Sequence, residues 1–400
     1  MRLAPVFTLW ALLSAPLQAQ QVSAPEPPGA KPEEKSRFGK LSNIFTGPLH
    51  PVIKGVVAGG GLGVGLGYDF PTVGRWETVA QTVVTFRRYW SAELETAYTG
   101  GRGRVGGYAR IREMSQLSYF GPGPQSDVND RTNFLLRDPV VGAVASTLVA
   151  NWMAAGVRVE EIWPHVGPGL SARHPSLEDR FSERDAPGLN AQPRFGRYQG
   201  FVEFQAPGAV SENLNQGGRY RIAYALYDDQ QFSRFNFTRI DLEARHRFAG
   251  FRPHHRFTLH GWMATTEPRS GNSVPFYMQP SLGGGGEIRS VGEDLIGSDG
   301  SRATLRGFDN YRFRDLNLML LQAEYRVPVW GPVDASVFVD AGKVAARRAD
   351  LNFTGLKRDY GFAVSLMRGP NTMARTEFGF GGGEGMHVKI SFGLGDDVLY

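Results

Sequence analysis

The sequence predicts an all-β protein, a transmembrane antiparallel β-barrel of about 16 strands. Segments of about ten residues, in which polar and apolar side chains alternate, recur along most of the chain. Glycine makes up 51 of the 400 residues without the triplet period of collagen, so it must serve turns and strands. The amino terminus adds a third observation, because it has the layout of a secretory signal.

The amino-terminal segments are not expected to join the barrel. An apolar run at Leu3–Leu13 is followed by the small-residue exit LQAQ at Leu17–Gln20, which predicts a signal peptide over residues 1–19. Residues 20–51 are rich in proline, glutamate and lysine and are expected to form a disordered periplasmic linker. Residues 52–400 contain no comparable linker and are expected to form the outer-membrane barrel. The chain has no cysteine, so disulfides cannot stabilise it.

The alternation is clearest in the second half of the chain. In Thr238–Phe248, charged residues share one face of the predicted strand and apolar residues share most of the other. The charged face consists of Arg239, Asp241, Glu243, Arg245 and Arg247. The same period of two recurs in Tyr220–Leu226, Leu318–Val327 and Val333–Gly342.

A soluble β-sandwich also alternates, so the membrane assignment needs a further argument. The polar faces carry dense ladders of arginine and acids, which suit a water-filled lumen better than a scattered surface. Aromatic residues cluster near expected strand ends, as girdles at two membrane interfaces require. They are Tyr68, Phe70, Tyr89, Trp90, Tyr277 and Trp330. With the signal sequence, these features favour a closed barrel in the outer membrane of a diderm bacterium, where closure leaves no sheet edge unpaired in lipid.

One apolar segment, Pro139–Val157, is long enough to be a transmembrane helix. Its valines and threonine favour strands, and Arg158 and Glu160 resume the alternation directly after it. We therefore expect two strands that meet near Asn151, with a single helix as the alternative.

The chain ends in an alternating strand. Its apolar face comprises Met386, Val388, Ile390, Phe392 and Leu394, and the parity continues to the terminal Tyr400. Such a strand is typical of the signal by which the outer-membrane assembly machinery recognises its clients, so that machinery is an expected partner. Candidate strands up to this one number roughly sixteen, an even number as single-chain bacterial barrels require.

The glycine-rich connection between Pro280 and Leu316 contains the stretch TLRGFDNYRF at Thr304–Phe313, which includes the motif LRGF at Leu305–Phe308. A solvated loop has no use for so many aromatic rings around an arginine. Together with Glu324 and the sequence FVDAG at Phe338–Gly342, this motif resembles the barrel of the BamA/TamA superfamily, also called the bacterial surface antigen family. The block Ile111–Phe134 also resembles a stretch of its short members. The resemblance covers about residues 53–400.

The resemblance implies that the loop between strands 11 and 12 folds into the lumen. Arg306 would be the cation at its tip, Gly307 would let the turn pass close to the wall, and Phe308 would pack beside it. Glu324 and Asp340 would be the acid partners of the loop.

The residues themselves are compatible with this role. Glu324 and Asp340 lie on the polar faces of their predicted strands, and Asp340 belongs to the motif bounded by Phe338 and Gly342. A guanidinium can hold a carboxylate through two hydrogen bonds, whereas an ammonium offers a point charge. The alternative is that Arg306 is a solvated loop charge and Asp340 one of many lumen acids.

The expected linker is too short for the periplasmic modules that precede the barrel in members that fold or secrete polypeptides, each about the size of a small domain. The chain is therefore expected to be a short form, and a separately encoded periplasmic partner could replace the modules. The cargo, protein or lipid, is not identified by the sequence.

A glycine stripe suggests a weak seam in the barrel. It consists of Gly59, Gly61, Gly63, Gly65 and Gly67. We expect it to form the first strand and to close against the last, at His387–Leu394, which includes Phe392. Glycine weakens a strand and leaves its register poorly specified, so the seam could open sideways to admit outer-membrane lipid or a nascent strand. The alternative is that the glycines make room for a plug.

The sequence gives little support to an enzyme. It has no GxSxG, HExxH or P-loop motif, and its histidines lack metal-ligand spacing, so no catalytic residue, metal or cofactor is expected. Acids are interleaved with the arginines within single strands, which argues against a nucleic-acid partner despite the net charge of +5. The favoured function is insertion or translocation of protein or lipid at the outer membrane. The alternatives are a passive porin-like channel and, less favoured, an outer-membrane lipase.

Overall fold

The computed structural model describes residues 47–206, 217–252, 254–284, 304–368 and 371–392. Its strands are β1 Leu49–Lys54, β2 Gly63–Asp69, β3 Trp76–Thr85, β4 Trp90–Gly100, β5 Gly103–Tyr119, β6 Thr132–Arg137, β7 Val140–Ala150, β8 Met153–Ile162, β9 His165–Pro168, β10 Phe195–Gln205, β11 Gly217–Asp229, β12 Phe237–Ala249, β13 Arg256–Pro268, β14 Ser281–Leu282, β15 Phe313–Arg314, β16 Asn317–Trp330, β17 Val333–Ala345, β18 Lys357–Arg368, β19 Asn371–Gly381 and β20 Met386–Phe392. Four short 3-10 helices are η1 Val128–Asp130, η2 Leu177–Asp179, η3 Phe276–Met278 and η4 Arg348–Asp350.

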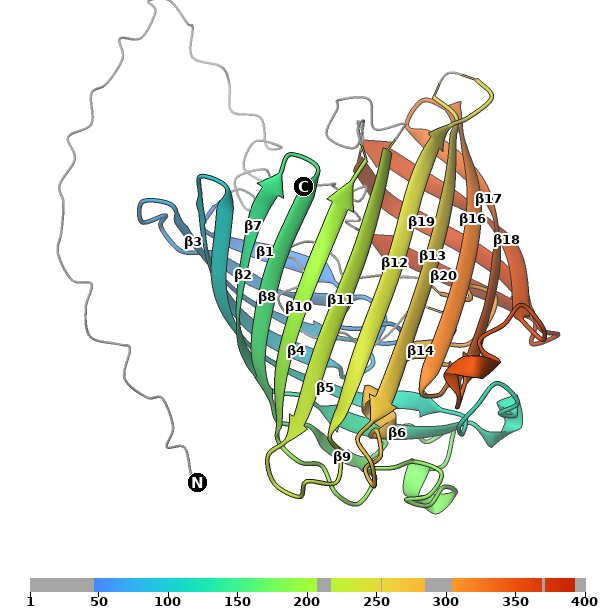
Figure 1. Ribbon diagram of the computed structural model, residues 1–400. Helices are drawn as coiled ribbons and strands as arrows, with labels where there is room; N and C mark the ends of the chain where they lie inside the picture. Colours follow the sequence, from blue (N-terminus) through green and yellow to red (C-terminus); the bar gives the residue numbers. More distant parts are fainter. Residues whose placement is uncertain (1–46, 207–216, 253, 285–303, 369–370, 393–400) are drawn as a thin grey trace, which may run out of the picture. The chain divides into compact units, whose positions relative to one another are not determined.

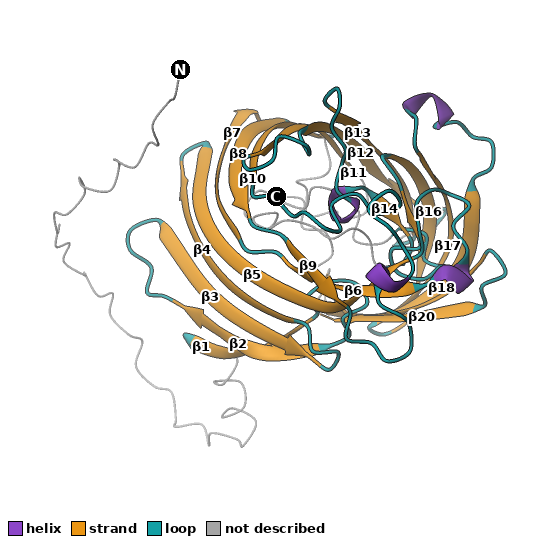
Figure 2. Cartoon of the chain, turned by 90° about the horizontal axis from the view of Figure 1, so that it is seen from below, coloured by secondary structure: helices purple, strands orange, loops and turns teal. Residues whose placement is uncertain are grey.

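Sixteen of the described strands form an antiparallel meander in chain order: β1–β5, β7, β8, β10–β13 and β16–β20. The sheet curls around a central space in which loops lie (Figure 2). The predicted fold class is therefore confirmed. The eleventh and twelfth strands of the meander are β13 and β16, so the connection that contains Thr304–Phe313 joins these two. Among the described residues, β1 pairs with β2 and β20 pairs with β19, and no pairing joins β1 to β20.

The alternation of the sequence decides which face of each strand points inward. On β17, Ser336 and Asp340 are buried, whereas Val337 and Val339 on the opposite face are 59% and 56% exposed. Large apolar side chains point outward in the same way on β2, β8, β11 and β18. This arrangement is the reverse of a soluble core and is typical of a barrel whose outer face meets lipid.

The apolar segment Pro139–Val157 forms two strands, as predicted. β7 ends at Ala150 and β8 begins at Met153, so Asn151 and Trp152 make the turn. Within the residues that the structure describes, no helix is long and apolar enough to cross a membrane.

The two rims of the barrel, where neighbouring strands are connected, differ in the length of their connections (Figure 1). At one end, tight turns such as Asn151–Trp152 and Gly331–Pro332 join neighbouring strands, and β1 begins and β20 ends there. At the other end, longer connections carry β6, β9 and the four 3-10 helices. β5 extends beyond its pairing with β7 and pairs there with β6, which in turn pairs with β9.

The long connections pack together around an apolar cluster. Its members include Met114, Leu117 and Tyr119 of β5, Phe134 of β6, and Leu177, Phe276 and Tyr311 of other connections. The rings of Phe276 and Phe134 meet edge to face, with their centroids 4.9 Å apart. Through these contacts, connections that are distant in the sequence pack against one another at one end of the barrel.

Two of the predicted girdle aromatics are in this cluster instead. Tyr89 and Tyr277 are buried, because the packing of the long connections covers them. Tyr68, Phe70 and Trp330 are exposed, as a girdle requires.

β1 begins at Leu49, three residues before the expected start of the barrel at residue 52. The predicted signal peptide, most of the predicted linker, and the end of the last strand with Leu394 and Tyr400 lie outside the described residues.

Candidate functional site

The connection between β13 and β16 folds into the interior of the sheet. Its two short strands, β14 and β15, pair with each other. Leu282, Leu305, Phe308 and Phe313 of this connection are almost fully buried in one cluster. The cluster also contains inward-facing residues of the wall, which are Trp262, Ala264, Leu318, Leu320 and Val344. The apolar residues of the TLRGFDNYRF motif therefore cover the inner face of β13, β16 and β17.

Arg306 points from this loop at acids of the wall. Its Nε donates to Asp340 Oδ2 at 2.8 Å and its Nη2 donates to Asp340 Oδ1 at 2.7 Å, a two-pronged contact. Its Nη1 donates to Glu324 Oε2 at 2.7 Å, and the backbone N–H of Arg306 adds a bond to Asp340 Oδ2 at 3.2 Å. Arg306 is 7% exposed and Asp340 is 0% exposed. The structure thus brings together the arginine and both acids that the sequence singled out.

The guanidinium also lies over the ring of Phe338, with its carbon 3.6 Å from the ring centroid. The face of an aromatic ring attracts a cation, so Phe338 completes the cage around Arg306. Burial lowers the pKa of Arg306, but the surrounding carboxylates raise it well above its ordinary value, so the group stays charged.

Gly307 of the loop motif and Gly342 of the FVDAG motif lie where an added side chain would collide with neighbouring atoms. A Cβ on Gly307 would lie 2.6 Å from Asp359 Cβ and 2.7 Å from the carbonyl carbon of Phe380. A Cβ on Gly342 would lie 2.9 Å from Leu282 Cδ1. Gly307 therefore lets the loop backbone lie directly against the wall, and Gly342 leaves room for the Leu282 side chain of the loop.

Four charged residues of the site were missed by sequence reasoning. Glu377 of β19 is a third acid partner and accepts a longer bond from Arg306 Nη1 at 3.4 Å. Arg375 bridges the acids, because its Nη2 donates to Glu324 at 2.9 Å and its Nε to Glu377 at 3.0 Å. Asp359 lies opposite Asp340, and Lys389 lies opposite Glu377, on neighbouring strands. The alternation of Arg375 and Glu377 in the sequence was the available signal.

The far end of the motif contacts both ends of the meander. The hydroxyl of Tyr311 donates to the carbonyl of Ala58, in the connection between β1 and β2, at 3.0 Å. Arg312 Nε donates to Glu384 Oε1, in the connection between β19 and β20, at 2.8 Å. Arg312 also donates to Ser126 in the block Ile111–Phe134, at 2.8 Å. The loop is therefore bonded to the first hairpin, the last hairpin and a long connection.

The glycine stripe is not the first strand, and this prediction is wrong. Gly63, Gly65 and Gly67 belong to β2, while Gly59 and Gly61 lie in the preceding connection with φ of 83° and 78°. The edge strand is β1, which the sequence pattern did not separate from the linker. Phe392 is the last described residue of β20 and pairs with Ala374 of β19.

The glycines of β2 permit a close approach of its neighbours. A Cβ on Gly65 would lie 1.7 Å from the carbonyl oxygen of Thr82 on β3, and one on Gly67 would lie 2.5 Å from His50 Nε2 on β1. The idea that the glycines make room for a plug applies only to Gly59, whose Cβ would lie 3.1 Å from Asn310 Nδ2 of the inward-folded loop.

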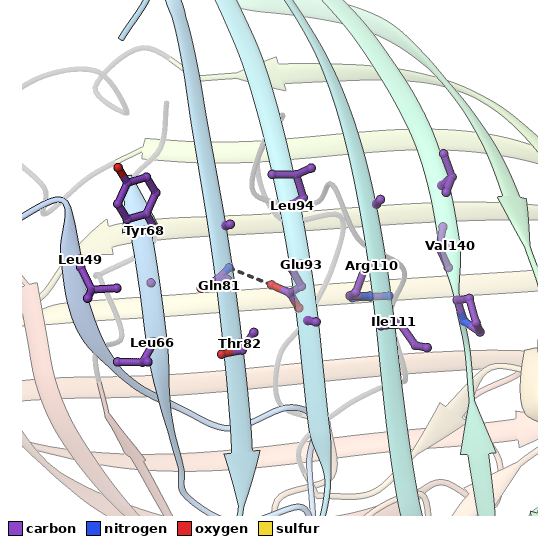
Figure 3. Close-up of a pocket in the computed structure, with 16 residues that line it drawn as sticks. Leu49, Leu66, Tyr68, Gln81, Thr82, Glu93, Leu94, Arg110, Ile111 and Val140 are labelled. Carbon is purple, nitrogen blue, oxygen red and sulfur yellow. Dashed lines mark hydrogen bonds between the residues drawn. The ribbon is translucent and has the colours of Figure 1, made fainter. Parts of the chain in front are cut away.

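A shallow apolar hollow lies on the first strands of the meander (Figure 3). It measures about 530 Å³, and its outward-facing lining includes Leu66 of β2, Leu94 of β4 and Val141 of β7, which are all exposed. On the inner face of the same strands, Gln81 donates to Glu93 at 2.8 Å. The edge region of the sheet thus has an apolar outer face and a polar inner face.

Comparisons with known proteins agree with this architecture. No family model matches the sequence, and no curated protein matches it. Among solved structures, BamA from Haemophilus ducreyi, in a form lacking POTRA domains 1–3, is similar with a TM-score of 0.56 and 11% identity, over 86% of this chain and 68% of that one. CdiB from Escherichia coli is similar with a TM-score of 0.55 and 10% identity, over 86% of this chain and 62% of that one. CdiB from Acinetobacter baumannii is similar with a TM-score of 0.51 and 10% identity, over 83% of this chain and 55% of that one.

The chain spans between about half and two thirds of the length of these proteins. At such low identity the likeness concerns the fold. In its fold, the chain is a BamA/TamA-like β-barrel with a loop folded into its lumen.

Proposed function

We propose that this protein is an outer-membrane barrel that inserts or translocates protein or lipid through the seam between its first and last strands. The observation that carries the proposal is the inward-folded loop. Buried Arg306 fixes it to β16, β17 and β19, and its far end is bonded to the connections that follow β1 and precede β20. A loop held in this way can hold the rest of the barrel together while the two edge strands separate.

The edge strands also support the proposal. β1 has six residues and is shorter than most other strands of the meander. The neighbour of β1 is β2, whose three glycines offer few side-chain contacts to fix its register. Separating such a seam costs fewer contacts than separating two long central strands. Polar backbone groups exposed there would pair with a nascent strand or meet lipid headgroups.

The orientation in the membrane follows from the connections. In outer-membrane barrels the short turns face the periplasm and the long loops face outward. We therefore place the start of β1 and the end of β20 on the periplasmic side. The packed long connections then cover the outer mouth.

The reconstituted full chain provides a direct test. Vesicles with and without the protein are given a urea-unfolded outer-membrane barrel, and its folding is followed by protease resistance. In parallel, the movement of a fluorescent phospholipid between leaflets is measured. We expect the protein to accelerate at least one of the two processes. Rates equal to those of empty vesicles in both assays would refute the proposal.

A passive channel is the second candidate, and conductance separates it from the first. The Arg306 tether and the cluster of long connections occupy the interior and one mouth, which favours low, flickering conductance in a planar bilayer. A large and stable pore would support the channel instead. A lipase has no support from any residue arrangement described above, and release of fatty acid from lipid by the purified protein would be the result in its favour.

A further inference from the structure

A hollow on the outer face of β12, β13, β16 and β17 has features of a ligand site. It measures about 460 Å³, within the range of about 300–1,000 Å³ that is usual for small-molecule sites. Its outward-facing lining combines small and branched apolar residues with one histidine. These residues are Ala244, His246, Leu259, Gly261, Leu321, Ala323, Val339 and Ala341.

The register of the strands explains the hollow. Across the four strands, Ala244, Gly261, Leu321 and Ala341 lie in one row, in which three of the four side chains are small. The next row toward the turn between β12 and β13 holds His246, Leu259, Ala323 and Val339. Small residues beside larger ones leave a depression with an apolar lining, which suits a hydrocarbon chain.

Aromatic rings form the next row beyond the hollow, at the turn between β12 and β13. Phe248 lies opposite Phe257, which lies opposite Tyr325, and the ring centroids of Phe248 and Phe257 are 6.2 Å apart. The ring of His246 contacts that of Phe248 at a tilt of 40°, with the centroids 4.3 Å apart. Phe251 of the turn contacts Tyr325, with centroids 5.8 Å apart. An aromatic group of this kind is usual where a barrel crosses the membrane interface.

Two histidine–tyrosine pairs on this outer face keep a hydrogen-bond donor to spare. His246 Nδ1 lies 2.6 Å from the Tyr220 hydroxyl, and His255 Nδ1 lies 2.8 Å from the Tyr325 hydroxyl. If the tyrosine donates, the neutral imidazole carries its proton on Nε2; if the imidazole donates, the tyrosine keeps its O–H. In either arrangement one N–H or O–H of each pair remains after the internal bond. On a face that meets lipid, such a donor is costly unless an acceptor lies beside it.

The turn beside these pairs is cationic. Arg252 and His254 are exposed there, and the N–H of His255 donates to the carbonyl of Arg252 at 3.1 Å. Phosphate and ester oxygens of a phospholipid are acceptors that lie at this depth of the bilayer. A net negative headgroup also complements the charge of Arg252.

We propose that this face binds one anionic phospholipid of the periplasmic leaflet. One acyl chain lies in the hollow along Ala244 and Gly261, and the headgroup meets the donors of the His246 and His255 pairs beside Arg252. The proposal rests on the barrel lying in the membrane with its short turns in the periplasm, but not on the seam or on any cargo.

The test uses the full chain in nanodiscs that contain equal amounts of phosphatidylglycerol and phosphatidylcholine. The lipids that stay bound after transfer to detergent are counted by native mass spectrometry. We expect one retained lipid per chain, with phosphatidylglycerol preferred by about tenfold, because its headgroup lacks the choline cation that Arg252 would repel.

Two variants separate the acyl slot from the headgroup site. Gly261→Phe places a ring on the wall of the hollow, and its Cβ meets no clash, because the nearest atoms are Leu321 Cδ2 at 3.7 Å and Leu320 O at 4.0 Å. It should abolish retention of the lipid. The matched control is Gly107→Phe on β5, where the nearest atoms lie at 3.8 and 3.9 Å, and it should retain the lipid. The variant Arg252→Gln should bind lipid but lose the preference for phosphatidylglycerol.

Equal retention by Gly261→Phe, Gly107→Phe and the unchanged chain would overturn the acyl slot. Equal retention of the two lipids by the unchanged chain would overturn the headgroup site and leave only annular lipid. A chain that does not enter nanodiscs at all would instead contradict the membrane location. The failure of the lipid site is therefore distinguishable from the failure of the proposed function.

Discussion

Replacement of Arg306 by alanine is the perturbation with the largest expected effect on the barrel. The substitution removes the two bonds to Asp340, the bond to Glu324 and the contact with the Phe338 ring. It leaves the carboxylate of Asp340, which has no solvent exposure, without its guanidinium. Removing one partner of a buried ion pair costs about 3 to 5 kcal/mol, because the other charge stays buried and uncompensated. Arg306→Lys keeps the charge but loses the two-pronged geometry, so we expect an intermediate loss of about 1 to 3 kcal/mol.

The free energy of unfolding is measured by urea titration of the protein in lipid vesicles, followed by tryptophan fluorescence and extrapolated linearly to zero urea. Arg347→Ala is the matched control. Arg347 Nε also donates to an aspartate, Asp350, at 2.8 Å, but its side chain is 79% exposed. Solvent screens such a pair, so the control should show little change. Equal unfolding free energies for Arg306→Ala and Arg347→Ala would show that the lumen tether contributes nothing, and the argument from burial would fail.

Three further perturbations test neighbouring parts of the account. Gly307→Ala places a Cβ 2.6 Å from Asp359 Cβ, and such overpacking should lower the free energy of unfolding by about 1 to 3 kcal/mol in the same urea titration. An unchanged free energy of unfolding would show that the loop backbone can move away from the wall. Gly65→Ala places a Cβ 1.7 Å from Thr82 O and should speed amide hydrogen exchange in β2 and β3. The control is Gly200→Ala on β10, where no atom lies within 4 Å of the added Cβ, and exchange in β10 should stay unchanged. Equal changes in exchange for the two variants would contradict the close approach at β2. Arg312→Gln removes the bond to Glu384 and should speed exchange at the tip of the β19–β20 hairpin, and exchange that stays the same would mean that the loop does not hold this hairpin.

The strands were predictable because alternation is a local property of the sequence. β12, β16 and β17 lie where the period of two placed them, and the apolar segment at residues 139–157 divides at the expected turn. The contact of Arg306 with Glu324 and Asp340 was accessible because the acids lie on polar faces and the loop motif resembles a known one. These two acids lie 18 and 34 residues from the arginine.

The rest depends on how the sheet curls, which a local pattern does not specify. Glu377 lies 71 residues from Arg306 and meets it only because β19 comes round to the same side of the lumen. The glycine stripe was assigned to the edge because its pattern is strong, while the true edge strand β1 is short and contains Pro51. Tyr89 and Tyr277 have the composition of girdle residues, and only the packing of the long connections shows that they are buried.

The central claim, that the seam between β1 and β20 must open, is tested most directly by closing it covalently. The chain has no cysteine, so one can be placed at Val52 on β1 and a second, in separate variants, at His387, Lys389 or Ser391 on β20. The pair that forms a disulfide is then assayed for client folding and lipid movement in vesicles, oxidised and reduced. We predict that oxidation abolishes the activity and that reduction restores it. Full activity with the seam locked would contradict the account.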